Sequence, residues 1–200
     1  MAWIEPGNVY LNQTQMDNNA WEVYNFFTSL NPPWQMISVA ALCGNMQLES
    51  TINPGKINSG SGAYGLTQWT NNKNKMQTWC TSNGYQYDSG IGQTHYIEWE
   101  RANPGPNGSD QWYATPSYNL SMSAFAYNSN NNDLNYLTAA FKYNYERNHN
   151  EDVSTRQHYA EHYYELFGGT PPPGPGNLLK KILGALLKPT WYLPYTRFRN

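Results

Sequence analysis

The sequence has few charged side chains, two cysteines and no long apolar segment. Charged residues make up 13% of its 200 positions. No stretch reaches the roughly 18–20 apolar residues that a membrane-spanning helix needs. The first residues have neither a basic start nor an apolar run of signal-peptide length. We therefore expect no membrane span, and a protein that is made in a cytoplasm and leaves it, if at all, by a route other than secretion.

Cys43 and Cys80 do not make a disulfide framework or a metal site, and we expect neither a metal nor a cofactor. Each cysteine falls in a predicted helix. Buried free thiols are the favoured interpretation, with one disulfide between them as the alternative. The four histidines show no accompanying pattern of metal ligands.

Aromatic residues are abundant: the chain has 17 Tyr and 8 Trp, and aromatics make up 16% of it. Such a chain can fold around a sizeable aromatic core, which argues against overall disorder. Charge is distributed unevenly, because residues 1–176 hold 7 basic and 14 acidic residues, whereas the last 24 hold 5 basic and none acidic. No basic patch offsets the acidic excess of the main part, so we expect it not to bind nucleic acid.

Apolar residues recur at helical spacing along most of the chain. The pattern predicts a mainly α fold with helices near 14–30, 32–50, 72–83, 89–102, 117–129, 133–148 and 152–167. Pro32 and Pro33 are expected in the first turn of the second helix. Glycine-rich residues 55–70 predict a loop or a small β-hairpin, and residues 103–116 a long surface loop.

A Pro/Gly linker at 169–176 separates a domain at 1–168 from a basic amphipathic tail at 177–200. Leucine and isoleucine share one face of a short predicted helix in this tail. Its length of about 16 Å is too short to cross a bilayer. We favour docking of the tail on a protein partner, and the alternative is contact with an anionic membrane surface.

Glu49 is the only acidic residue between Glu22 and Asp88, and it lies at the C-terminal end of an otherwise apolar predicted helix. The helix dipole disfavours negative charge there, and the nearest basic residue in the sequence is Lys56. Partial burial and a helix C-terminus both favour the protonated form of a carboxyl. A proton donor to a glycosidic oxygen needs that form. From spacing alone, an exposed glutamate of no consequence is the simpler interpretation.

The glycine-rich segment adds features of a sugar-binding loop. Its glycines allow positive φ and close approach of the backbone to a ligand. Tyr64, Gln68 and Trp69 provide the stacking and hydrogen bonding that pyranose recognition requires. A glycine-rich turn with an aromatic residue is also common in ordinary hairpins, so this pattern alone is weak evidence.

Glu49-Ser50 followed by Gly65-Leu66-Thr67-Gln68 resembles the Glu-Ser and Gly-Leu-Met-Gln signature of goose-type lysozymes and lytic transglycosylases. The longer strings at 44–50 and 63–70 resemble still more closely the phage tail lysozyme family. That family includes the wall-degrading domain of tail-tip proteins in short-tailed phages related to phi29. The resemblance covers about residues 16–167 and implies a lysozyme-like α domain with a small hairpin by the active site.

The resemblance implies roles for individual residues. Glu49 matches the family's general acid, and Tyr64 and Gln68 match substrate-binding positions that line the cleft. Trp69 is counted with these substrate-binding residues, and its other expected role is to support the hairpin. Tyr127-Asn128 resembles the Tyr-Asn pair that lytic transglycosylases place in the cleft, although the glycine that usually follows is replaced.

Two reactions share protonation of the leaving oxygen by Glu49. Hydrolysis normally needs a second carboxylate across the sugar, whereas a lytic transglycosylase lets the muramic acid 6-hydroxyl attack. Glu146 is a candidate second carboxylate, although an ion pair at a helix end is its favoured interpretation. The other acidic candidates are Asp88, Glu98, Glu100 and Asp110.

We favour hydrolysis of the MurNAc-GlcNAc β-1,4 bond of peptidoglycan, with transglycosylation as the alternative. A third reading is a catalytically silent, wall-binding structural tail protein. The resemblance implies a phage-tail component of the virion that is made in the host cytoplasm and digests the host cell wall locally during DNA entry. Its expected partners are peptidoglycan strands and, through residues 177–200, other tail proteins.

Overall fold

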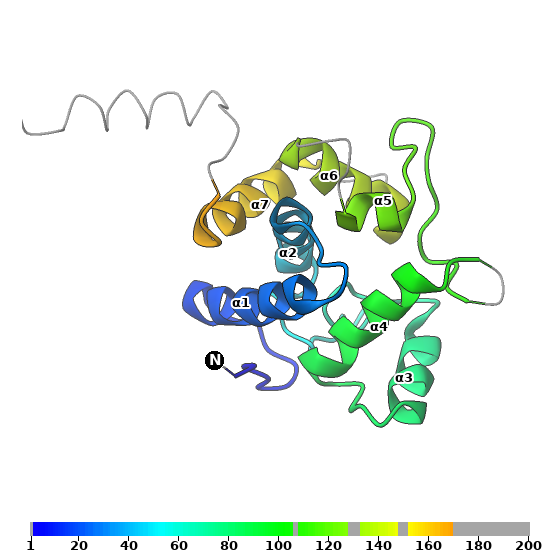
Figure 1. Ribbon diagram of the computed structural model, residues 1–200. Helices are drawn as coiled ribbons and strands as arrows, with labels where there is room; N and C mark the ends of the chain where they lie inside the picture. Colours follow the sequence, from blue (N-terminus) through cyan, green and yellow to red (C-terminus); the bar gives the residue numbers. More distant parts are fainter. Residues whose placement is uncertain (1, 106–107, 128–132, 148–151, 170–200) are drawn as a thin grey trace, which may run out of the picture. The chain divides into compact units, whose positions relative to one another are not determined.

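A computed structural model describes residues 2–105, 108–127, 133–147 and 152–169. The predicted basic tail, most of the predicted linker and Asn128 lie outside the described residues. The described part is mainly helical, as the sequence predicts (Figure 1). Its elements are α1 (Gln13–Ser29), α2 (Met36–Ser50), α3 (Lys73–Ser82), α4 (Gly90–Ala102), α5 (Met122–Tyr127), α6 (Leu134–Phe141), the π-helical turn η1 (Lys142–Glu146) and α7 (Ser154–Leu166).

Helix α2 is the central element of the fold. It contacts α1, α5, α6 and α7, and Figure 1 shows it enclosed by its neighbours. Residues on every side of α2 are buried, as expected for a helix that is apolar all round. Packing against α7 is closest at Gly44, where a Cβ atom would lie 2.6 Å from the backbone nitrogen of Ala160. Gly44 therefore lets the two helix backbones approach each other.

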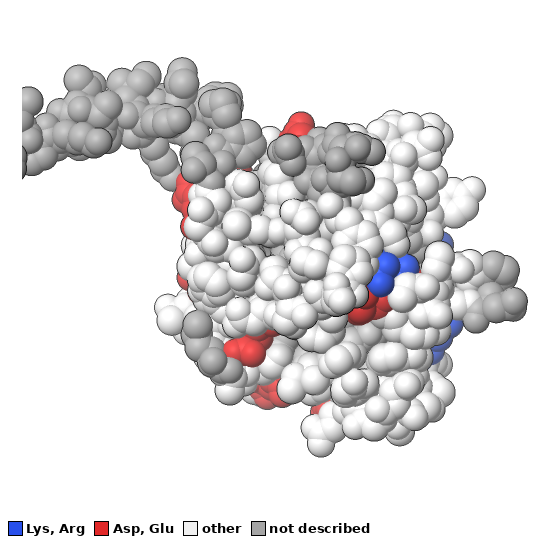
Figure 2. Space-filling model, in the orientation of Figure 1, with Lys and Arg blue, Asp and Glu red and all other residues white. Residues whose placement is uncertain are grey.

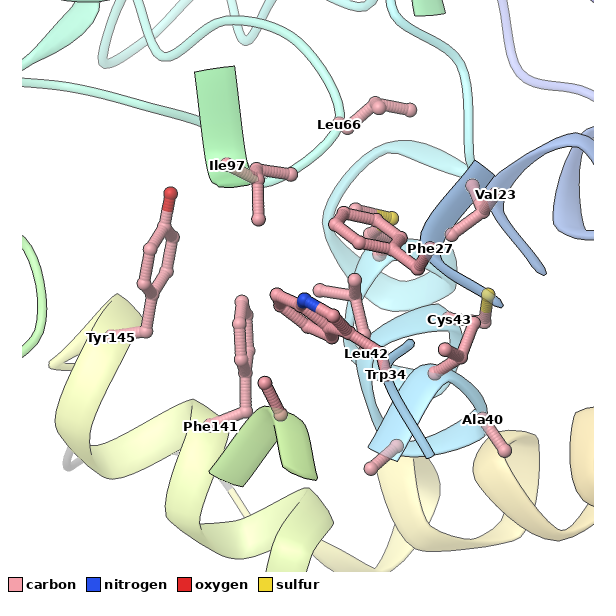
Figure 3. Packing of buried hydrophobic residues seen from close by; sticks show 14 of the residues in the cluster. Val23, Phe27, Trp34, Ala40, Leu42, Cys43, Leu66, Ile97, Phe141 and Tyr145 are labelled. Carbon is pink, nitrogen blue, oxygen red and sulfur yellow. The ribbon is translucent and has the colours of Figure 1, made fainter. Parts of the chain in front are cut away.

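Aromatic rings fill the core beside α2. The rings of Phe27 and Trp34 lie 4.2 Å apart, and those of Phe141 and Tyr145 stack at 4.5 Å (Figure 3). All four side chains are almost fully buried. The predicted aromatic core is thus present, and its rings connect α1, α6 and η1 with the segment that leads into α2.

The prediction that Pro32 and Pro33 lie in the first turn of the second helix is wrong, because α2 begins at Met36 with Gln35 as its N-cap. The preceding residues are held by other contacts. The backbone N–H of Trp34 donates to the Phe27 carbonyl at 3.0 Å, and its indole is 1% exposed. Burial of this ring fixes the segment before the helix as an extended connection.

The small β-hairpin predicted within 55–70 is not confirmed. This segment has two isolated antiparallel bridges, Ile57 with Tyr64 and Tyr64 with Trp69. Its many turns prevent a regular ladder from forming. Cys43 in α2 and Cys80 in α3 are buried free thiols, which agrees with the favoured interpretation.

Candidate active site

Glu49 occupies the last turn of α2, one residue before the helix ends. Thr51 and Ile52 follow with φ values of 57° and 53°, so the chain turns away sharply into the glycine-rich loop. The Glu49 side chain keeps 20% of its surface exposed, whereas Ser50 and Ile52 are fully buried. The helix end therefore presents this carboxylate to solvent.

Ser50 joins the helix end to the loop. Its hydroxyl donates to the Leu66 carbonyl at 2.9 Å, and the Leu66 N–H in turn donates to the side-chain oxygen of Gln93 at 2.8 Å. The two halves of the sequence motif, Glu49-Ser50 and Gly65-Leu66, are therefore held together directly. Motif spacing alone does not show this contact, because it depends on the path of the intervening loop.

Gly65 is required where it stands. It has a φ of 78°, and a Cβ atom there would lie 2.5 Å from the Gln93 side-chain oxygen. The Gln93 amide also donates to the Pro54 and Tyr87 carbonyls, each at 2.8 Å. Gln93, which lies in α4, thus holds the loop in place, a role that was not predicted from the sequence. Its one signal in the sequence is a polar side chain on the buried face of the helix.

Arg156 is the second residue that sequence reasoning missed. Its Nη2 atom lies 2.5 Å from Glu49 Oε1, and its Nη1 atom lies 2.7 Å from Glu146 Oε2. The Arg156 side chain is 1% exposed. Lys56 is the basic residue nearest to Glu49 in the sequence, but the ion-pair partner of Glu49 comes from α7, 107 positions away. The charge beside Glu49 is therefore supplied by a tertiary contact.

Tyr64 and Gln68 have mostly internal contacts. Tyr64 is 8% exposed, and burial, with smaller effects of Asp88 and Tyr87, raises its pKa to about 12. With Ile57 and Asp88 it lines a surface pocket of about 400 Å³. The Gln68 amide donates to the Gly65 carbonyl at 3.0 Å and to the Lys56 carbonyl at 3.2 Å. Both side chains therefore stabilise the loop, and substrate binding by them stays a prediction.

Trp69 has no open ring face for a sugar, because it is 2% exposed. Its indole N–H donates to the Tyr145 hydroxyl at 2.9 Å. In this conformation its contacts are with the core, and both roles considered from the sequence, substrate binding and support of the loop, stay predictions. The large buried ring holds the loop against η1.

A buried carboxyl lies behind this tryptophan. Glu100 accepts hydrogen bonds from the Tyr145 hydroxyl and, at 3.0 Å, from the Ser109 hydroxyl. Burial raises the pKa of Glu100 to about 7, and the hydrogen bonds from Tyr145, Ser109 and Tyr96 offset part of that rise. Glu100 is 2% exposed, so its position suits a structural group rather than one that reaches a glycan.

Tyr127 ends α5, and the Arg101 guanidinium lies 5.1 Å from the centre of its ring. Burial raises the pKa of Tyr127. Arg101 is paired with Glu98 at 2.6 Å, so Glu98 is also engaged. Among the acidic candidates for a second group, Glu146 is the one that the described contacts connect to Glu49, through Arg156.

Within the described part of the chain, His, Cys, Asp and Glu side chains form no group of three or more that would hold a metal ion. His162 pairs with Asp17 at 2.8 Å. No helix in the described ranges is long and apolar enough to cross a membrane. On the face seen in Figure 2 most of the surface is uncharged, with a few scattered acidic and basic side chains.

A partly exposed glutamate at the end of a buried helix, tied to a glycine-rich loop in a mainly helical domain, defines a lysozyme-like protein. Residues 18–167 match the model of the phage tail lysozyme family, and the chain belongs to that family. A relative is morphogenesis protein 1 of Bacillus phage B103, which is 31% identical over 168 residues. The match covers 81% of this chain and 42% of the relative, so the chain spans less than half the length of that protein.

Proposed function

We propose that this protein cleaves the MurNAc-GlcNAc β-1,4 bond of peptidoglycan with Glu49 as the general acid. The observation that carries the proposal is the position of Glu49: it is the partly exposed carboxylate at the point where α2 meets the glycine-rich loop. Membership of the phage tail lysozyme family supports the same substrate. Protonation of the leaving oxygen is the step that such a carboxyl supplies.

Hydrolysis requires that water attack the sugar, normally with the help of a second carboxylate. The Glu146 side chain is 4% exposed and paired with Arg156, which leaves it poorly placed to act as nucleophile or base. This burial favours a second candidate function, lytic transglycosylation, in which the muramic acid 6-hydroxyl attacks. Mass spectrometry of digested peptidoglycan separates the two, because the 1,6-anhydro product is lighter by one water molecule.

Replacement of Glu49 by Gln tests the acid role, because Gln keeps the size of the side chain and cannot donate a carboxyl proton. We expect this variant to release no muropeptides from purified Gram-positive walls. Glu165→Gln is the matched control, since Glu165 is an exposed acid in the last turn of α7. A folded wild-type protein that leaves walls intact would instead support the catalytically silent, wall-binding role.

The biological setting is also part of the proposal. We infer a virion component that is made in the host cytoplasm and digests the host wall locally during DNA entry. The relative's name, morphogenesis protein 1, supports a role in the phage particle. The basic tail at 177–200 is proposed to dock on other tail proteins, with an anionic membrane as the rival surface. Liposome co-sedimentation of the full chain and of a chain that ends at Gly176 distinguishes these two surfaces. Equal binding of both chains to liposomes would exclude contact of the tail with a membrane.

A further inference from the structure

Arg156 places one buried positive charge between two carboxylates. Glu49 and Glu146 bind different nitrogen atoms of the same guanidinium, at 2.5 and 2.7 Å. The Glu49 side chain is 20% exposed, whereas those of Glu146 and Arg156 are 4% and 1% exposed. Burial of an ionised group costs free energy unless the group is paired, and here two carboxylates share one buried cation.

Neutral contacts hold the guanidinium in place as well. Its Nη1 atom lies 3.3 Å from the side-chain oxygen of Asn45 and 3.4 Å from the Asn45 carbonyl. The amide nitrogen of Asn45 donates to the Ala41 and Thr138 carbonyls. Close packing of Gly44 against the Arg156 carbonyl and Ala160 fixes the helix that carries the arginine. Arg156 is therefore held rigidly, and Glu49 is the partner that reaches the surface.

We propose that Arg156 is a positioning residue that receives the Glu49 carboxylate as it forms during the acid step, while Glu146 balances the arginine charge beforehand. This inference rests on the proposed role of Glu49. The proton moves from the Glu49 carboxyl to the glycosidic oxygen, the bond from the sugar carbon to that oxygen breaks, and its electron pair stays on the oxygen. Glu49 is left as a carboxylate.

The Arg156–Glu49 ion pair reaches full strength only after the proton has left Glu49. It therefore stabilises the transition state more than the bound substrate, which is the condition for an interaction to accelerate a reaction. Before proton transfer, Glu146 keeps the buried guanidinium paired. Glu146 therefore balances the positive charge of Arg156 and takes no direct part in attack on the sugar.

Other charged groups lie on the elements that carry Glu146 and Arg156. Lys142 is in η1 with Glu146, and its Nζ atom lies 4.5 Å from the centre of the Tyr143 ring. Farther along α7, His162 pairs with Asp17 of α1. Variants at Arg156 and Glu146 leave these residues in place.

The test is the dependence of kcat/KM on pH for muropeptide release by the full chain. Glu146→Gln removes one of the two carboxylates that the described contacts place on Arg156, so the guanidinium attracts the Glu49 carboxylate more strongly. We expect this variant to be active, with the alkaline limb of the profile moved down by about half a pH unit or more. An unchanged profile, or a folded variant with no activity, would overturn the inference, the latter because it would make Glu146 catalytic.

Arg156→Lys is a second, independent variant. A lysine keeps the charge but lacks the planar pair of nitrogen atoms that binds two carboxylates at once. We expect kcat to fall by roughly tenfold or more with little change in KM, because the loss concerns the transition state. Wild-type kcat in this variant would contradict the proposal. Near-wild-type activity in Glu49→Gln would overturn the proposed function itself. Failure of the predictions at Glu146 and Arg156, together with an inactive Glu49→Gln, would overturn only this inference.

Discussion

The indole N–H of Trp69 donates a 2.9 Å hydrogen bond to the hydroxyl of Tyr145. This contact joins the glycine-rich loop to η1, the turn that also carries Glu146. The same hydroxyl donates to the buried Glu100 carboxyl. One phenol therefore links the loop beside the proposed acid to a carboxyl on α4, and the loop position depends on a buried network.

Tyr145→Phe removes that hydroxyl and leaves the Trp69 N–H and one Glu100 oxygen without this partner. We expect a loss of about 1–3 kcal/mol in the free energy of unfolding, because both groups are buried. Urea denaturation followed by circular dichroism measures it. Tyr113→Phe is the control, since Tyr113 is 70% exposed. Equal stability of the two variants would show that the network contributes nothing.

Glu100 is expected to make stability depend on pH. Burial raises its pKa from an ordinary value of 4.5 to about 7, so the folded protein holds a proton that the unfolded chain releases. The bound proton contributes about 3 kcal/mol to the free energy of unfolding. This contribution is complete below about pH 4.5 and is lost as the pH rises through 7.

Glu100→Gln removes this dependence, because an amide does not titrate. The difference in unfolding free energy between variant and wild type is expected to move in favour of the variant between pH 4.5 and 8. Denaturation midpoints across that range measure it, with Glu165→Gln as a control at an exposed site. A constant difference across the range would mean that Glu100 is ionised throughout.

Gly44→Ala tests the close approach of α2 and α7. Alanine normally stabilises a helix relative to glycine by about 1 kcal/mol. Here the new Cβ would meet backbone atoms of Arg156 and Ala160 at 2.6 Å, so we expect the opposite sign. Lower stability and lower wall-degrading activity should appear together, because the shift displaces Arg156. Gly60→Ala, whose Cβ meets nothing closer than 3.4 Å, is the control, and a stabilised Gly44→Ala would refute the packing argument.

The sequence predicted the helices well because their apolar stripes are local signals. The expected second helix ended near Ser50, and α2 does end there, which places Glu49 in its last turn. The start of the same helix was predicted wrongly. Burial of Trp34 against Phe27 decides that start, and it is a tertiary contact that no local pattern contains.

The surroundings of Glu49 were harder to predict than Glu49 itself. Arg156 reaches it from α7, a helix that packs closely against α2 at Gly44. Trp69 looked suitable for stacking on a sugar, yet its ring is buried against Tyr145. An aromatic residue in a glycine-rich loop has the same appearance in sequence whether it faces a ligand or the core.

Muropeptide release by Glu49→Gln is the decisive measurement for the acid role of Glu49. We expect this variant, folded as shown by an unchanged circular dichroism spectrum, to release nothing from purified peptidoglycan, while Glu165→Gln matches the wild type. Release by Glu49→Gln at a rate near that of the wild type would contradict the assignment of Glu49 as the acid.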